Sequence, residues 1–394
     1  MTTTASEQQE VDIIGEAYQN ARAEGVQLRT GGAGYLKAIA PAKVNLYLGV
    51  GARQQNGYHT VQNIMHTLLI HDILYMRRLS FEAFAYETGI DYSKAGEGEA
   101  AGQQGEGEAA GQEARGQQAA GQQAVGQQKA QLAEASAAEA AGQQPLPLKI
   151  HLTCSGVGSL EIPSISAQEN IVYKALVALA RALGRNEDEV IDVHLEKHLP
   201  FQAGLGGGSS DAAAALMAAA KLWGVSADDA RIEQVAKTLG ADVAFFLRGG
   251  CALYNGAGEN YVHSLATNNA PVALIKPPAG LSTAAVYRAF DEAPHLPTRE
   301  QEAAALNAKT ACDVPLFNGL EQAAGHLDPT LAEIHAWANA QPGVERAMLT
   351  GSGSCTFAVC ESSAAALKIA AAAQARGWWA TSTYFANARA AVGK

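Results

Sequence analysis

Alternation of apolar residues with other residues predicts β-strands in this chain. It covers residues 44–49, 148–152 and 191–195. A period of two is expected for strands, because successive side chains of a strand point to opposite faces of the sheet.

Helical patterns alternate with these strands. A run over 171–183 begins after Asn170, a residue type that caps helix N-termini, and ends at Gly184. A second, alanine-rich helix is predicted over 209–223, and the segment 226–229 resembles a capping box for the helix that follows. The chain is therefore predicted to mix strands and helices.

Two segments lie outside this pattern. Residues 1–35 are polar and acidic, with a weakly helical stretch over 11–23, and we interpret them as a tail. Residues 95–145 consist largely of Ala, Gly, Gln and Glu. Because such a segment has almost no branched or aromatic side chains to offset the entropy of ordering, we expect a disordered or loosely helical insertion. A surface expansion is favoured over an interaction arm.

Composition narrows the classes of function. The chain has 394 residues, 48% of them hydrophobic, and a formal net charge of -11, which disfavours nucleic acid and anionic membranes as partners. Its five cysteines form neither a CxxC pair nor a cluster with metal-like spacing. The N-terminal residues do not resemble a signal peptide, and no stretch is apolar enough to span a membrane. We expect a cytoplasmic protein without zinc.

The glycine-rich segment 204–211, Gly-Leu-Gly-Gly-Gly-Ser-Ser-Asp, joins a predicted strand to a predicted helix. Unpaired N–H groups and the positive dipole end of a helix N-terminus favour bound anions such as phosphate. The spacing is neither that of a Walker loop nor that of a dinucleotide loop. A merely flexible connection is disfavoured, since glycines at a helix start cost stability.

Asp242 and Lys43 carry chemistry that suits phosphoryl transfer to an alcohol. Such a reaction uses a carboxylate to accept the hydroxyl proton and a cation to offset charge on the transferred group. Each residue also has a structural interpretation, Asp242 as a cap or turn residue and Lys43 as a solvated strand end. The residues alone leave both interpretations open.

Four segments in order are similar to the GHMP kinase superfamily: 41–46 with 57–59, then 204–213, 239–243 and 351–355. Pro-Ala-Lys-Val-Asn-Leu and Gly-Tyr-His in the first of these resemble the branch that acts on a cytidine diphosphate alcohol. The resemblance covers the chain except the tail and the insertion.

The resemblance implies an α+β, two-domain GHMP kinase fold. An N-terminal ribosomal protein S5 domain 2-like domain, residues 36–265, would bind ATP. A C-terminal ferredoxin-like α/β domain, residues 266–394, would bind substrate, with the active site in the cleft between them. The protein would be a monomer or a homodimer.

Roles for individual residues follow from the same resemblance. Asp242 would be the catalytic base, and Lys43 would hold it and the acceptor hydroxyl. The substrate-binding residues would be Asn45, Tyr58, His59, Thr283 and Tyr287. Of these, Tyr58 would stack on cytosine and His59 would bond to its edge. The loop 351–355 would close over the substrate.

ATP and Mg²⁺ are the implied cofactors. The ATP-binding residues would be Lys197, Gly204, Leu205, Gly206, Gly207, Gly208, Ser209 and Ser210. Ser210 would be near the magnesium, although Ser209 is an alternative.

The implied reaction phosphorylates the 2-hydroxyl of a diphosphocytidyl methylerythritol in the non-mevalonate route to isoprenoid precursors. Two alternatives are a GHMP kinase acting on another small alcohol, such as mevalonate or homoserine, and a nucleotide-binding regulator without catalysis. Tyr58 and His59 disfavour the first alternative, and the Lys43 and Asp242 pair disfavours the second.

Overall fold

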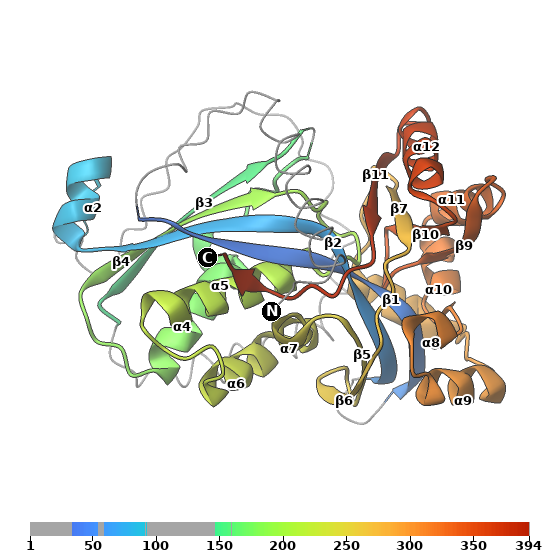
Figure 1. The fold of residues 1–394 in the computed structure, drawn as a ribbon, viewed down its shortest axis with the longest axis horizontal. Helices are drawn as coiled ribbons and strands as arrows, with labels where there is room; N and C mark the ends of the chain where they lie inside the picture. The colour runs from blue at the N-terminus through green and yellow to red at the C-terminus, as the bar shows by residue number, and fades with distance from the viewer. Residues whose placement is uncertain (1–33, 54–58, 91, 93–145, 159, 394) are drawn as a thin grey trace, which may run out of the picture. The chain divides into compact units, whose positions relative to one another are not determined.

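The computed structural model describes residues 34–53, 59–90, 92, 146–158 and 160–393. Residues Leu36–Lys394 form one compact unit by their contacts (Figure 1). Nearly all of the expected tail, including its helix over 11–23, the whole expected insertion over 95–145 and Tyr58 lie outside the described residues.

The larger sheet contains eight strands among the described residues, in the order β12-β1-β2-β4-β3 with three strands attached at the side. Long strands β1 and β2 pair antiparallel through most of their lengths, β3 runs parallel to β4, and β5 pairs with β2. The strands are β1 (Leu36–Arg53), β2 (His59–Leu79), β3 (Leu148–Gly156), β4 (Glu189–Lys197), β5 (Cys251–Asn255), β6 (Asn260–Leu265), β8 (Phe317–Asn318) and β12 (Ala391–Val392).

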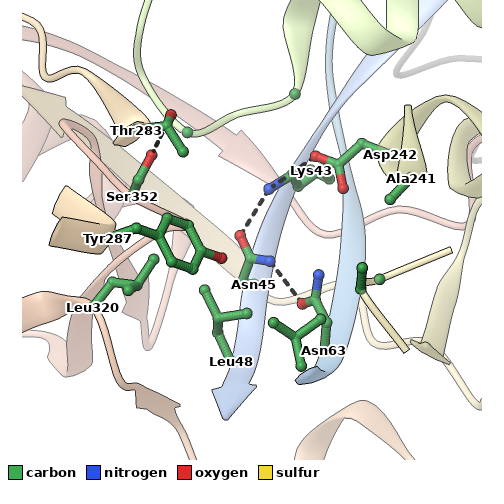
Figure 2. Close-up of a pocket in the computed structure, with 16 residues that line it drawn as sticks. Lys43, Asn45, Leu48, Asn63, Ala241, Asp242, Thr283, Tyr287, Leu320 and Ser352 are labelled. Atoms are coloured by element: carbon green, nitrogen blue, oxygen red, sulfur yellow. Dashed lines mark hydrogen bonds and ion pairs between the residues drawn. The ribbon is translucent and has the colours of Figure 1, made fainter. Parts of the chain in front are cut away.

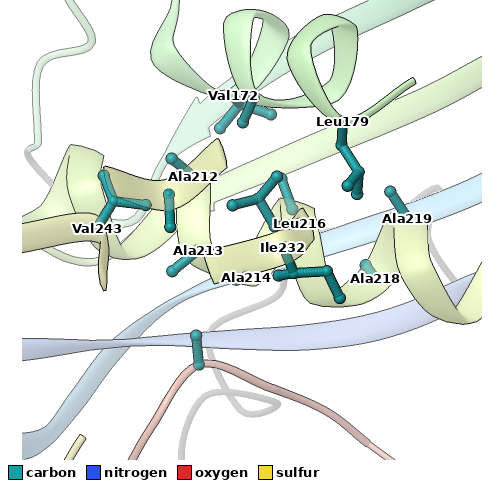
Figure 3. Packing of buried hydrophobic residues seen from close by; sticks show 14 of the residues in the cluster. Val172, Leu179, Ala212, Ala213, Ala214, Leu216, Ala218, Ala219, Ile232 and Val243 are labelled. Carbon is teal, nitrogen blue, oxygen red and sulfur yellow. The ribbon is translucent and has the colours of Figure 1, made fainter. Parts of the chain in front are cut away.

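Four helices pack on this sheet, and their contact forms the largest core cluster. They are α4 (Ile171–Ala182), α5 (Gly207–Leu222), α6 (Ala230–Leu239) and α7 (Ala241–Arg248). Helix α5 is central, and its buried alanines lie between the neighbouring helices and the strands (Figure 3). Small side chains on several faces of α5 allow this close approach, and they fix where its N-terminus lies.

A second sheet has the order β11-β7-β10-β9, and its strands pair antiparallel. Its strands are β7 (Pro271–Lys276), β9 (Val344–Leu349), β10 (Thr356–Cys360) and β11 (Trp379–Tyr384). Helices α11 (Pro329–Asn339) and α12 (Ser363–Gln374) share a core with it. Another cluster joins residues of β1 to residues of β7 and β10, so packed side chains connect the two sheets.

The remaining helices are α2 (Phe81–Thr88), α8 (Thr283–Glu292), α9 (Arg299–Asn307), α10 (Glu321–Leu327) and the short 3₁₀ turns η2 (Ala167–Glu169) and η3 (Ala311–Asp313). None of the helices in the described part of the chain is long and apolar enough to cross a membrane.

The predicted elements form with two corrections. Asn170 caps α4 as expected, accepting a hydrogen bond from the Val172 N–H at 2.9 Å. Helix α5 begins at Gly207 rather than at Ser209, because Gly206 adopts a left-handed conformation at its N-cap. The predicted capping box before α6 is wrong. Asp229 caps that helix itself, since its side chain accepts from the Arg231 N–H.

Candidate active site

A cavity of about 290 Å³ contains most of the predicted catalytic and substrate-binding residues. It is lined from β1, β2, the glycine loop, the start of α7 and the start of α8 (Figure 2). The lining residues include Lys43, Asn45, Asn63, Gly204, Gly206, Ala241, Asp242, Gly258, Thr283, Tyr287, Leu320, Gly351 and Ser352. Segments far apart in the sequence therefore meet at one place.

Lys43 and Asp242 lie together in this cavity, as the sequence predicted. The Lys43 Nζ atom is 3.6 Å from Asp242 Oδ2, and the Lys43 side chain is 5% exposed. The same Nζ donates to Asn45 Oδ1 at 2.7 Å, which confirms that Lys43 and Asn45 share a strand face. Burial strengthens the attraction between ammonium and carboxylate, because little water screens it. The ammonium is therefore held at a fixed position beside a partly exposed carboxylate.

The fold places Asp242 in the first turn of α7. Gly240, the N-cap of α7, has no side chain to cap the helix. The N–H groups of that turn and the helix dipole favour negative charge at this position. Asp242 is consequently a carboxylate in an electropositive setting that still reaches the cavity.

The glycine loop leads directly into α5. Gly204 and Gly206 both have φ of 72°, a left-handed conformation that side chains with a Cβ rarely adopt. A Cβ on Gly206 would lie 2.8 Å from the Phe246 ring and 3.1 Å from Lys43 Cγ. The loop is tied to β1 by a hydrogen bond from the Lys43 N–H to the Leu205 carbonyl at 2.9 Å. Its amides therefore start a helix within contact distance of Lys43.

Two of the predicted ATP-binding residues in this loop point inward. The Leu205 side chain is buried in the core, so only its backbone could contact a ligand. Ser210 is fully buried, and its hydroxyl has no hydrogen-bond partner among the described residues. Ser209 is half-buried.

Lys197, a predicted ATP-binding residue, lies at the end of β4 beside two carboxylates. Its ammonium forms ion pairs with Asp72 and Asp211 beneath the glycine loop. Asp72 also accepts from the backbone N–H groups of His198 and Leu199 at 2.6 and 2.8 Å. The side chain of Lys197 thus fixes the chain at the end of β4, and its ammonium is engaged by carboxylates.

This buried cluster perturbs its ionisable groups. Burial raises the pKa of Asp211 to about 8, and Lys197 opposes that rise while Asp72 adds to it. Burial alone would lower the pKa of Lys197, but Asp211 and Asp72 together raise it above its usual value. Lys197 is therefore a permanent cation in the folded protein.

Thr283 and Tyr287 line the opposite wall of the cavity from α8, one helical turn apart. Thr283 Oγ1 lies 2.9 Å from Ser352 Oγ, which joins α8 to the 351–355 loop. Burial, together with the charge of Asp242, raises the pKa of Tyr287 to about 12. Its hydroxyl consequently keeps its proton at neutral pH and can donate a hydrogen bond.

His59 lies behind this wall. Its Nδ1 is 2.9 Å from the Gly51 carbonyl, its Nε2 is 3.1 Å from Asp291 Oδ1, and its ring packs 5.3 Å from that of Tyr287. Because both ring nitrogens already have partners, hydrogen bonding to a base would require His59 to exchange one of them. Tyr58, the predicted stacking residue, lies outside the described residues.

Sequence reasoning missed several polar residues that shape the cavity. Thr350 accepts from the Asn45 N–H and donates to Asn45 Oδ1, both at 3.1 Å. Asn318 donates to the carbonyls of Leu349 and Gly351 at 2.8 Å and so holds the 351–355 loop. Asn63 accepts from Asn45 Nδ2 at 2.7 Å. Lone polar residues of this kind give no signal in a single sequence.

Comparison with known families agrees with this geometry. Residues 170–250 match the GHMP kinases N-terminal domain and residues 301–377 match the GHMP kinases C-terminal family. The fold is also that of a solved homoserine kinase from Cytophaga hutchinsonii, with a TM-score of 0.55, 17% identity, and coverage of 94% of this chain and all of that one. The fold is thus that of the GHMP kinases, which confirms the predicted fold class.

More similar relatives share a single name. A 4-diphosphocytidyl-2-C-methyl-D-erythritol kinase of Desulfitobacterium hafniense is 38% identical over 55% of this chain and 77% of its own length. The 4-diphosphocytidyl-2-C-methyl-D-erythritol kinase of Pelotomaculum thermopropionicum is 30% identical over 85% of this chain and 93% of its own length. A solved 4-(cytidine 5'-diphospho)-2C-methyl-D-erythritol kinase is 26% identical, with a TM-score of 0.59 over 89% of this chain and 99% of that one. The chain belongs to the family of 4-diphosphocytidyl-2-C-methyl-D-erythritol kinases.

Proposed function

We propose that this protein transfers the γ-phosphoryl group of ATP to the 2-hydroxyl of 4-diphosphocytidyl-2-C-methyl-D-erythritol, giving the 2-phosphate and ADP. The observation that carries the proposal is the Lys43 and Asp242 pair, 3.6 Å apart in a cavity that the glycine loop also lines. A carboxylate, a cation and a phosphate-binding loop in one cavity are what this reaction needs.

Each residue of the pair has a distinct part in the reaction. Asp242 accepts the proton of the acceptor hydroxyl, while the oxygen of that hydroxyl forms a bond to the γ-phosphorus. The bond between that phosphorus and the β,γ-bridging oxygen breaks, and ADP leaves with the electron pair. Lys43 keeps Asp242 oriented and stabilises the negative charge that develops. Asn45 holds the Lys43 ammonium in place through its Oδ1 atom.

The nucleotide phosphates bind at the N-terminus of α5. The N–H groups of Gly207, Gly208 and Ser209 fall in the first turn of that helix, and its N-cap Gly206 supplies no side-chain acceptor. These donors and the helix dipole suit a polyphosphate. Positive φ at Gly204 and Gly206 allows the backbone to approach it closely.

Magnesium fits the residues of this loop. Such a site commonly uses one or two protein oxygens together with substrate phosphates. The buried hydroxyl of Ser210, which has no partner among the described residues, is an oxygen that a cation would satisfy, and it favours Ser210 over Ser209. When bound, magnesium would neutralise charge on the phosphate oxygens.

Substrate recognition involves the opposite side of the cavity. We propose Thr283, Tyr287, Tyr58 and His59 as the residues that hold the cytidyl alcohol, with Tyr58 stacking on cytosine. In this arrangement residues 36–265 bind ATP and residues 266–394 complete the substrate site.

The experiment is a product assay with a panel of alcohols. Purified protein, ATP and magnesium are incubated with the cytidyl substrate, mevalonate or homoserine, and phosphorylated products are measured by mass spectrometry. We expect product only with the cytidyl substrate. Product with mevalonate or homoserine but not with the cytidyl substrate would contradict the proposed substrate.

A further inference from the structure

We infer that Asn63 binds substrate, with its side-chain nitrogen donating a hydrogen bond to an oxygen of the alcohol that receives the phosphate. The inference rests on the proposed function. Asn63 lies on β2, where it is 7% exposed, and its side chain lines the cavity next to Asn45 (Figure 2).

The orientation of the Asn63 amide is set by a relay of hydrogen bonds. The Lys43 ammonium has only donors, so the atom of Asn45 that lies 2.7 Å from it must be the acceptor Oδ1. Asn45 therefore presents Nδ2 to Asn63, at 2.7 Å, and Asn63 must accept with its own Oδ1. The remaining group of Asn63 is its NH₂.

Thr350 reinforces this relay. Its hydroxyl accepts from the Asn45 N–H, and its proton can be donated to Asn45 Oδ1 at 3.1 Å or to the Gly204 carbonyl at 3.3 Å. A flipped Asn45 amide would set its NH₂ against an ammonium, and that arrangement is excluded. The Lys43 ammonium thus fixes the orientation of both amides, so that the NH₂ group of each one points away from Lys43.

The Asn63 NH₂ is a donor without an acceptor among the described residues, although its oxygen is satisfied. The group belongs to a side chain that is almost entirely buried, and the open volume beside it is the cavity. That nitrogen is not among the fully buried atoms without a partner, so it is open to the cavity, where water or a ligand can accept from it. An oxygen of a bound substrate would satisfy it.

The position of Asn63 along β2 indicates which part of the substrate it contacts. His59 and Asn63 are four residues apart on one strand, so they share a face at about 13 Å separation. Asn63 lies at the end where the relay leads to Lys43 and Asp242. With cytosine recognised near His59, Asn63 faces the polyol that contains the acceptor hydroxyl.

Two substitutions separate the donor role from a scaffolding role. Asn63→Asp keeps an acceptor for Asn45 Nδ2 but removes both donor hydrogens, whereas Asn63→Leu removes donor and acceptor without adding charge. We expect both variants to raise KM for the cytidyl substrate roughly ten- to a hundredfold, with KM for ATP within about twofold of wild type. Asn307→Asp, on exposed helix α9, is the control for the charge change, and we expect it to behave as wild type.

The outcomes are distinct. A raised KM in Asn63→Leu alone would mean that Asn63 only supports Asn45, and a raised KM in Asn63→Asp alone would mean a charge effect. Either result overturns the inference. A wild-type KM for the cytidyl substrate in both variants would overturn it as well. Thermal unfolding of each variant shows whether it is folded.

Substrate analogues that lack single polyol hydroxyls provide a second test that does not depend on either variant alone. For the analogue without the accepting oxygen, the Asn63→Leu substitution should cause no further loss of kcat/KM. Losses that multiply for every analogue would contradict the contact. An inactive wild-type protein would overturn the proposed function and the inference together, whereas an active one with unaffected variants would overturn the inference alone.

Discussion

Removing Lys197 from its ion cluster with Asp72 and Asp211 should be one of the most destabilising single substitutions near the active site. Asp72 is fully buried and Asp211 is 2% exposed, so Lys197→Met would leave two carboxylates in the protein interior without their cation. Removing one partner of a buried ion pair costs about 3–5 kcal/mol. Asp72 retains its two backbone donors, so the loss falls mainly on Asp211 and is largest at pH 8 and above, where that side chain is ionised.

The decrease in the free energy of unfolding caused by Lys197→Met should depend on pH. A carboxylate without its cation can avoid the cost of burial by binding a proton, so the destabilisation should be smaller at pH 5.5 than at pH 8. The assay is urea unfolding of wild type and Lys197→Met at both pH values. Lys368→Met, on the exposed face of α12, is the matched control and should unfold as wild type does.

The refuting result is specific. A loss under about 1 kcal/mol would mean that the cluster contributes no more than a surface ion pair. An equal loss at both pH values would mean that Lys197 acts through packing and not through charge. Lys197→Met should also raise KM for ATP, since the cluster fixes the chain that leads into the glycine loop.

Two further outcomes follow from the same region. Gly206→Ala should destabilise by about 2–4 kcal/mol, because the new Cβ would lie 2.8 Å from the Phe246 ring at a positive φ. Gly208→Ala, whose Cβ would have only Ile171 at 3.7 Å, should leave the unfolding temperature unchanged or raise it; equal losses in both would refute the steric argument. Burial raises the pKa of Asp211 to about 8, so the folded chain keeps a proton that the unfolded chain loses near pH 4. Stability from this group is therefore present below pH 4 and lost as pH rises through 8. Asp211→Asn should unfold at a higher temperature than wild type at pH 9, by more than at pH 6, and an identical difference at both pH values would contradict this.

Lys43 and Asp242 could be named from the sequence as a proposed catalytic pair because part of their signal is local and a family resemblance supplied the rest. Lys43 and Asn45 are two residues apart on a strand with regular alternation, and the composition of the glycine loop alone predicts that a helix starts there. Asp242 follows a predicted helix, and similarity to a family assigned its role. The structure confirms that Lys43, Asn45 and Asp242 meet in one cavity.

Other features depend on contacts that no local pattern encodes. Asp72 is 125 residues from Lys197 in the sequence, and nothing near either residue indicates the other. Strand β2 lacks the alternation that identifies a strand, because long runs of it are buried on both faces. The proposed role of Asn63 depends on its hydrogen bond with Asn45, which the sequence does not reveal.

The start of α5 illustrates a different limit. Serine is a common cap residue, so the sequence favours a helix that begins at the serine pair. The helix begins earlier because Gly206 can adopt the left-handed conformation, in which its chain packs against Phe246 and Lys43. Tertiary packing therefore decided a boundary that local preference placed two residues later.

The central claim is that Asp242 accepts the proton of the acceptor hydroxyl during phosphoryl transfer. Its most direct test compares wild type with Asp242→Asn by single-turnover formation of the 2-phosphate, alongside calorimetric binding of ATP and of the cytidyl substrate. We expect the rate of transfer to fall by roughly 10²–10⁴-fold while both dissociation constants stay within a few-fold of wild type. Transfer at the wild-type rate by Asp242→Asn would contradict the account.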